Sequence, residues 1–160
     1  LALFGGFISV HVLGIFEPVM KFHPELFFFT PLIAAMAGNV GVQSSAIIVQ
    51  GLANNTIIGP VVERLLKELS LSLLNGVILS IILLAGSYFL LGYEIHVGYT
   101  VSIALLSVII MASLIGTFIP IILNKYGVDP ALATGPFITT SNDILGILTY
   151  FTIAKIILGI

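Results

Sequence analysis

The chain contains no cysteine and no tryptophan, and few of its residues carry a charge. The lack of cysteine excludes disulfides, thiolate metal sites and cysteine nucleophiles. The net charge of −2 shows no excess of basic residues, so we expect no nucleic-acid partner. The sequence also has no HExxH zinc motif and no serine–histidine pair with hydrolase spacing, so we do not expect an enzyme.

Most of the chain is apolar. Hydrophobic residues make up 59% of it and charged residues 8%, and its mean hydropathy is +1.24. Because a soluble domain is about one quarter charged, this composition predicts an all-α integral membrane protein. Runs of about 20 apolar residues are long enough to cross a bilayer. We expect five transmembrane helices, at about 1–20, 27–53, 66–92, 97–123 and 130–158.

We expect residues 1–160 to form a single transmembrane channel domain. The chain starts at Leu1, within an apolar run, and not at a methionine. From this start we expect a soluble N-terminal regulatory region to be absent from the sequence.

The few basic residues predict how the chain crosses the membrane. Connections on one side carry Arg64, Lys67 and Lys125, whereas those on the other side carry only Lys21. Because cytoplasmic loops carry the excess of lysine and arginine, the 54–67 and 124–129 connections are assigned to the cytoplasm. The N-terminus is then cytoplasmic and the C-terminus external. We expect a multi-pass protein of the cell inner or plasma membrane.

Asp143 is the most informative single residue. It lies inside the fifth apolar span, with no basic residue within ten positions on either side. A carboxylate at membrane depth costs about 2.5–3.5 kcal/mol on insertion scales. Such residues usually mark a cation pathway, a proton relay or a buried partner.

Small and oxygen-bearing residues surround this carboxylate, and Asn142 adds an amide next to it. One helical face carries five residues at spacings of three or four: Gly135, Thr139, Asp143, Gly146 and Tyr150. Hydroxyl, carbonyl and carboxylate oxygens are the hard ligands that Mg²⁺ and Ca²⁺ prefer, which favours a metal site. The alternative is a polar seam between helices, in which Asp143 is protonated and hydrogen-bonded.

Polar residues outside the fifth span suggest further cation contacts. Asn39 and Gln43 are four residues apart in the second span, so both face the same way on a helix. Glu68 and Asp129 lie at the expected cytoplasmic ends of the third and fifth spans, where they could form an inner-mouth metal site. The alternatives are a packing seam of small residues around Asn39 and a helix-capping role for Asp129 before Pro130.

One intramembrane carboxylate per chain is too little charge for a divalent cation. Two-fold symmetric dimers are the commonest oligomers. If the fifth spans of two chains face a shared axis, two Asp143 carboxylates neutralise one such ion. Mg²⁺ keeps several waters when one or two carboxylates hold it. The sequence therefore predicts a pore at the axis of a C2 homodimer.

Two motifs carry most of this pattern. The first is Pro31 followed by Gly38–Gln43 (GNVGVQ), and the second is Asp129–Gly146 (DPALATGPFITTSNDILG). Both resemble the transmembrane domain of the MgtE family of magnesium transporters. The resemblance covers essentially the whole chain, and the second motif is long and specific.

The resemblance implies a homodimeric Mg²⁺ channel with its pore on the dimer axis. The family's central aspartate falls on Asp143, which would bind largely hydrated Mg²⁺, and Thr139 would contribute a backbone oxygen. Asn39 would lie near the pore, and Glu68 and Asp129 near its inner mouth. Typical members also have cytosolic N-terminal and CBS domains that sense Mg²⁺ and close the pore, and this sequence has neither. Selectivity among Mg²⁺, Mn²⁺, Co²⁺ and Ca²⁺ stays open.

Proton-coupled secondary transport is the main alternative, with Asp143 as the proton carrier. Against it, the sequence offers no obvious acid–base partner apart from His11 on another span. A purely structural subunit is a further alternative, but it leaves the polar run of the fifth span unexplained.

Overall fold

The computed structural model describes residues 2–57, 59–133 and 135–159. Every regular element in these residues is a helix, so the all-helical class is confirmed. In chain order the elements are α1 (Ala2–Ile15), α2 (Glu17–Phe22), α3 (Glu25–Ala53), α4 (Val61–Phe89), α5 (Ile95–Lys125), the 3₁₀ helix η1 (Pro130–Ala133) and α6 (Pro136–Leu158).

Four of the helices are long and apolar enough to cross a membrane: α3, α4, α5 and α6. They correspond to the second to fifth expected spans. α1 has 14 residues, and at 1.5 Å per residue it covers about 21 Å of a hydrocarbon core about 30 Å thick. The first expected span, over residues 1–20, is therefore not confirmed. The helix ends before Pro18, which has no N–H to continue the hydrogen bonds of α1.

The start of the expected fifth span also differs from a single helix. Residues from Pro130 onward form the short η1, and α6 begins only at Pro136. Gly135 precedes α6 with φ +61°, a left-handed conformation that favours glycine. Pro136 then occupies the first turn of α6, where a missing N–H removes no hydrogen bond. This break makes Gly135 part of a turn rather than of the helical face predicted for it.

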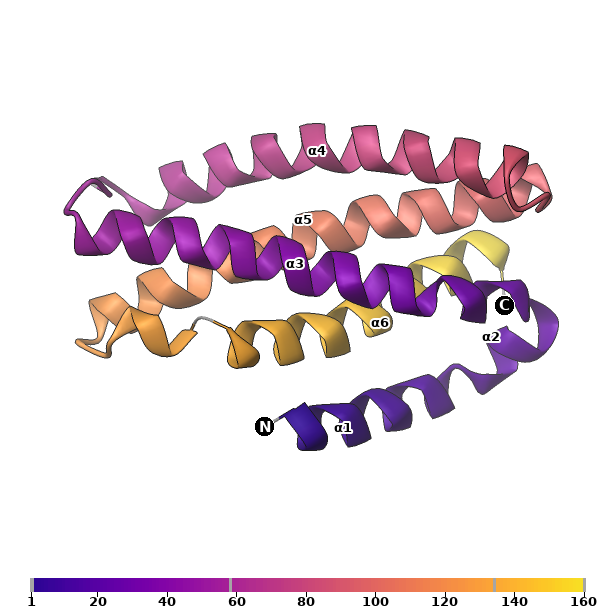
Figure 1. Ribbon diagram of the computed structural model, residues 1–160, viewed down its shortest axis with the longest axis horizontal. Helices are drawn as coiled ribbons and strands as arrows, with labels where there is room; N and C mark the ends of the chain where they lie inside the picture. Colours follow the sequence, from indigo (N-terminus) through magenta and orange to yellow (C-terminus); the bar gives the residue numbers. More distant parts are fainter. Residues whose placement is uncertain (1, 58, 134, 160) are drawn as a thin grey trace.

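The long helices lie side by side, with α4 at one edge and α1 at the other (Figure 1). α5 packs against α3, α4 and α6, whereas α1 packs mainly on α6. The core is built around α5 and includes Val101, Val108 and Ala112, which are fully buried. α4 buries only small residues along its length: Ser72, Gly76, Ser80 and Ser87. Small side chains let two helix backbones approach closely, which fixes α4 against α5.

Tyr150 fastens the middle of α6 to the start of α3. Its side chain is fully buried, and its hydroxyl donates a hydrogen bond of 2.9 Å to the carbonyl of Leu26. Its ring also packs against Phe151. The residues predicted to share one helical face thus have different surroundings. Gly135, Thr139 and Asp143 line a cavity that is described below, whereas Tyr150 is part of the protein core.

Candidate cation site

Asp143 lies half-buried on α6, at the edge of a cavity of about 470 Å³. The cavity is formed by the start of α6 and by α1. It is lined by Gly135 of the turn before α6, by Thr139 and Asp143 of α6, and by Gly5 and Ser9 of α1, among others. The structure therefore brings together three of the residues predicted to contact metal. The α1 residues were not predicted, although the Gly5-Gly6 pair in an apolar run was a signal of close packing.

Gly38 of α3 lets the second span approach this carboxylate. A β-carbon added to Gly38 would lie 2.8 Å from Oδ1 of Asp143 and 3.3 Å from Cγ2 of Thr139. The side chain of Asp143 thus lies directly against the α3 backbone, and a side chain at position 38 would push the carboxylate aside. The first of the two glycines in the Gly38–Gln43 motif is explained by this contact.

Thr139 orients the turn that opens α6. Its hydroxyl donates a hydrogen bond of 3.1 Å to the carbonyl of Gly135, and its N–H donates another of 3.0 Å to the same oxygen. The Thr139 hydroxyl keeps its lone pairs as acceptors for a water or a cation. The cavity therefore offers hydroxyl and carboxylate oxygens, which are hard ligands.

Asn142 is adjacent to Asp143 in sequence but lies outside this cavity. It is fully buried, and its amide packs in the notch left by Gly41 of α3. Neither its Oδ1 nor its Nδ2 has a hydrogen-bond partner. Gly116 of α5 lies against the backbone of Gly41 at the same point, so three helices cross around this amide.

Asn39 and Glu68 line a second cavity, of about 490 Å³, between α3, α4 and α5. Gln43, Ser44 and Asn75 add further polar side chains to it. The hydroxyl of Ser44 donates a hydrogen bond of 2.7 Å to Oε1 of Glu68. Sequence reasoning named Asn39 and Glu68 separately, and the structure brings them into one polar cavity apart from Asp143.

Asp129 is exposed, and its side chain makes a local hydrogen bond within the loop that contains it. Its Oδ1 accepts a hydrogen bond of 2.9 Å from the N–H of Ala131, at the start of η1. This is the capping role considered as an alternative for Asp129. Glu68 is instead bonded to α3, so no contact in the described residues joins the two carboxylates into an inner-mouth site.

Carboxylates and histidines also gather at the opposite end of the helices. Nδ1 of His23 lies 2.9 Å from Glu25, and Nδ1 of His96 lies 3.1 Å from Glu94. Lys21 lies 2.8 Å from Glu17, and its hydrogen bond and positive charge lower the pKa of that exposed carboxyl. Within the described part of the chain, no three histidine or carboxylate side chains converge as a metal-holding group.

Long apolar helices around a half-exposed carboxylate are features of an integral membrane protein with a polar site at membrane depth. The MgtE family model, described as a divalent cation transporter, matches residues 30–153. The chain belongs to the MgtE family, which confirms the resemblance found in the two sequence motifs.

Three curated relatives bear the name magnesium transporter MgtE. The protein from Bacillus subtilis is 39% identical over 155 residues, that from Enterococcus faecalis 35% over 156, and that from Thermus thermophilus 32% over 154. Each alignment covers 96% of this chain but 34% of the relative. The chain thus spans about a third of the length of these relatives.

Proposed function

We propose that this chain conducts Mg²⁺ across a membrane through a dimeric pore, with Asp143 as the central site for the hydrated ion. The observation that carries the proposal is the half-exposed Asp143 carboxylate in a cavity of about 470 Å³ inside a set of apolar helices. Family membership and the printed names of the three relatives support Mg²⁺ as the transported ion.

The surroundings of Asp143 suit a hydrated cation better than a stripped one. A dehydrated Mg²⁺ demands six oxygens in near-ideal octahedral geometry, whereas this cavity offers one carboxylate, with the hydroxyl residues Ser9, Thr139 and Thr140 in its lining. An ion that keeps its water can use Asp143 for charge and Thr139 and Gly135 for hydrogen bonds to that water. On this account Mn²⁺ and Co²⁺, which form similar hydrates, pass more readily than Ca²⁺.

A second copy of the chain would supply the missing charge. Asp143 makes no hydrogen bond or ion pair within the described residues, so its negative charge is not neutralised by the protomer. Two Asp143 carboxylates facing a C2 axis balance one divalent cation. In this proposal the homodimer is required for ion binding, because one chain alone supplies only half of the negative charge.

One face of α3 supports this arrangement. Asn39 and Gln43 are both exposed and lie one turn apart on a helix that is otherwise apolar enough to span a bilayer. Polar side chains at membrane depth usually face a bundle interior or a water-filled cavity rather than lipid. We infer that this face of α3, which borders the cavity of Asn39 and Glu68, turns toward the dimer axis.

We assign the other predicted site residues different roles along the proposed pathway. Asn39 lines the path beside α3, and Glu68 provides charge in the neighbouring cavity through which cations would reach the cytoplasm. Asp129 acts at the mouth from its exposed loop. Asn142 positions α6 against α3 rather than touching the ion, because its amide is fully buried.

We also propose the orientation given by the basic residues. Arg64, Lys67 and Lys125 lie at one end of the long helices, where α4 starts and α5 stops. The positive-inside rule assigns that end to the cytoplasm, in a multi-pass plasma membrane protein. A cysteine placed in the 54–57 connection should then react with a membrane-impermeant thiol reagent only after cells are opened.

Ion flux into proteoliposomes tests the proposed function. The protein is reconstituted around a Mg²⁺-sensitive dye, and Mg²⁺ is added outside with and without a pH gradient. Conduction predicts dye signal in both conditions at similar rates. Flux that requires the pH gradient, or proton movement without Mg²⁺, would favour the alternative in which the unpaired Asp143 carries a proton.

A further inference from the structure

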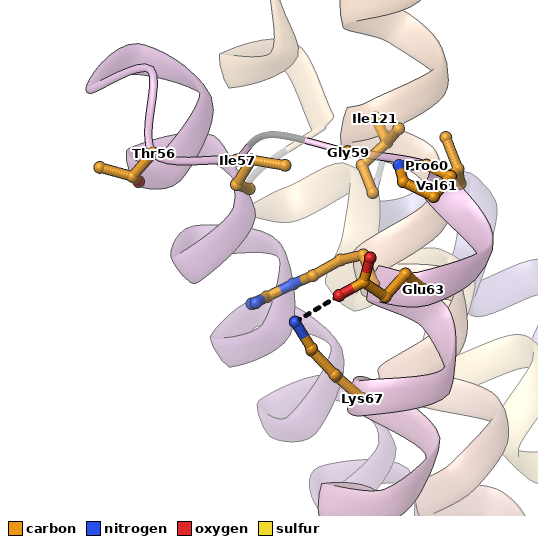
Figure 2. A pocket seen from close by; sticks show the side chains of 9 residues that line it. Thr56, Ile57, Gly59, Pro60, Val61, Glu63, Lys67 and Ile121 are labelled. Atoms are coloured by element: carbon orange, nitrogen blue, oxygen red, sulfur yellow. Dashed lines mark hydrogen bonds and ion pairs between the residues drawn. The ribbon is translucent and has the colours of Figure 1, made fainter.

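We propose that the connection between α3 and α4 binds the phosphate group of an anionic membrane lipid through Arg64. A cavity of about 120 Å³ lies there, large enough for a phosphate group. Its lining includes Thr56 and Gly59 of the connection and Glu63, Arg64 and Lys67 of α4 (Figure 2). This inference does not depend on which ion the pore carries.

Arg64 is a cation without an anion. Its Nε is buried and has no hydrogen-bond partner, although Arg64 lines a cavity. Arg64 as a whole is half-buried, so the cost falls on this one N–H, and native proteins normally give such a buried donor a partner. The carboxylate that lines the cavity is already engaged, because Lys67 donates a hydrogen bond of 2.8 Å to Glu63 (Figure 2). The cavity thus holds one positive charge that no described residue neutralises.

The geometry of this site suits phosphate. A guanidinium presents its N–H groups as a planar fork that matches two oxygens of a phosphate. α4 starts at Val61 after the extended Pro60 and has no side-chain hydrogen bond to cap it. Its first free N–H groups add positive potential at the same place. Arg64, Lys67 and the start of α4 therefore favour an anion together, and Arg64 is the group that needs one.

The location favours a lipid as the source of the phosphate. The cavity lies at the start of α4, a helix long enough to cross a bilayer. Val62 and Leu66, in the same turns as Arg64, are 65% and 58% exposed and would face acyl chains. Anionic headgroups attract basic residues at the cytoplasmic membrane surface, and each contributes about 1 kcal/mol. A headgroup at Arg64 would fix the register of α4 in the membrane.

Native mass spectrometry of the detergent-purified protein tests the proposal. The protein is exchanged into mixtures of phosphatidylglycerol and phosphatidylcholine, and the lipids retained are counted. We expect the wild type to retain phosphatidylglycerol preferentially and Arg64→Gln to weaken that retention about fivefold. Arg64→Lys, which keeps the charge but loses the fork, should fall between them. Lys125→Gln, which removes a basic residue at the same end of the helices, should behave as the wild type.

A parallel arm separates the two sources of phosphate. Inorganic phosphate is titrated into the protein in phosphatidylcholine alone, with thermal unfolding as the readout. Stabilisation by inorganic phosphate that Arg64→Gln abolishes, without preference for phosphatidylglycerol, would overturn the lipid assignment. Equal phosphatidylglycerol retention by wild type, Arg64→Gln and Arg64→Lys would overturn the site altogether and point to another segment of protein as the partner of Arg64.

Discussion

Asp143 and Asn142 are neighbours in the sequence, yet the structure gives their side chains different surroundings. Successive helical residues are rotated by about 100°, so one can face a cavity while the other faces the core. Asp143 borders the cavity with α1, and Asn142 is enclosed between α3, α5 and α6. The sequence identified both as polar residues in a membrane span but did not show which of them was accessible.

Replacing Asn142 with leucine tests its role in positioning α6. Its amide makes no hydrogen bond, so the change removes two unsatisfied polar atoms and loses no bond. We expect the variant to unfold in detergent at the wild-type temperature or higher, as followed by circular dichroism. Unfolding at a clearly lower temperature would show that the amide has a partner in the membrane-embedded protein and would contradict this account.

At the scale of elements, the charge clusters and apolar runs predicted the four long helices to within a few residues. α4 starts at Val61 rather than near residue 66, because its first turns are charged but still helical. Lys67 and Glu63 are spaced i, i+4 and pair across one turn, which supports a helix outside the apolar run. Hydropathy alone marks where the apolar segment begins, whereas the helix itself begins earlier, at the first backbone hydrogen bonds.

The break before α6 and the short α1 were harder to predict. Both depend on single turns, at Gly135 and near Pro18, whose effect is local and does not alter the hydropathy of the span. The cavity beside Asp143 depends in turn on where α1 packs. Pairwise packing of this kind is not encoded in the periodicity of one span, so the lining from Gly5 and Ser9 could not be predicted.

Gly116→Ala tests the crossing of α5 over α3. A β-carbon at Gly116 would meet the backbone of Gly41, which cannot move aside as a side chain can. We expect a loss of stability of about 1–3 kcal/mol, measured by denaturant or thermal unfolding in detergent. The matched control is Gly86→Ala in α4, where a β-carbon meets nothing within 4 Å. Equal stability of the two variants would show that α3 and α5 do not cross as closely as described.

At the scale of the whole molecule, the proposal depends on a second copy of the chain. A protomer brings one half-exposed carboxylate to its cavity, and within the described residues no cluster of three acidic or histidine ligands completes a metal site. The polar exposed face of α3 is consistent with burial against a partner. The dimer axis is therefore expected near α3 and α6 rather than near α4.

The absence of cysteine makes that expectation easy to test. Asn39→Cys introduces a single thiol on the exposed face of α3, and Ile82→Cys introduces one on the exposed face of α4. In membranes treated with a short bifunctional thiol reagent, we expect a covalent dimer from Asn39→Cys and mostly monomer from Ile82→Cys on a denaturing gel. The reverse pattern would place the dimer axis at α4 and would separate it from Asp143.

The most direct measurement compares Mg²⁺ influx for the wild type and Asp143→Asn in proteoliposomes, with Glu94→Gln as a control. Both variants change one carboxylate to an amide, but Glu94 is exposed at a helix end and Asp143 lines the cavity. We predict that Asp143→Asn lowers the influx about tenfold or more, because the ion loses its main negative charge in a site of low dielectric. Glu94→Gln should conduct as the wild type. Equal influx through wild type and a folded, dimeric Asp143→Asn would contradict the account, since the ion would then pass without using Asp143.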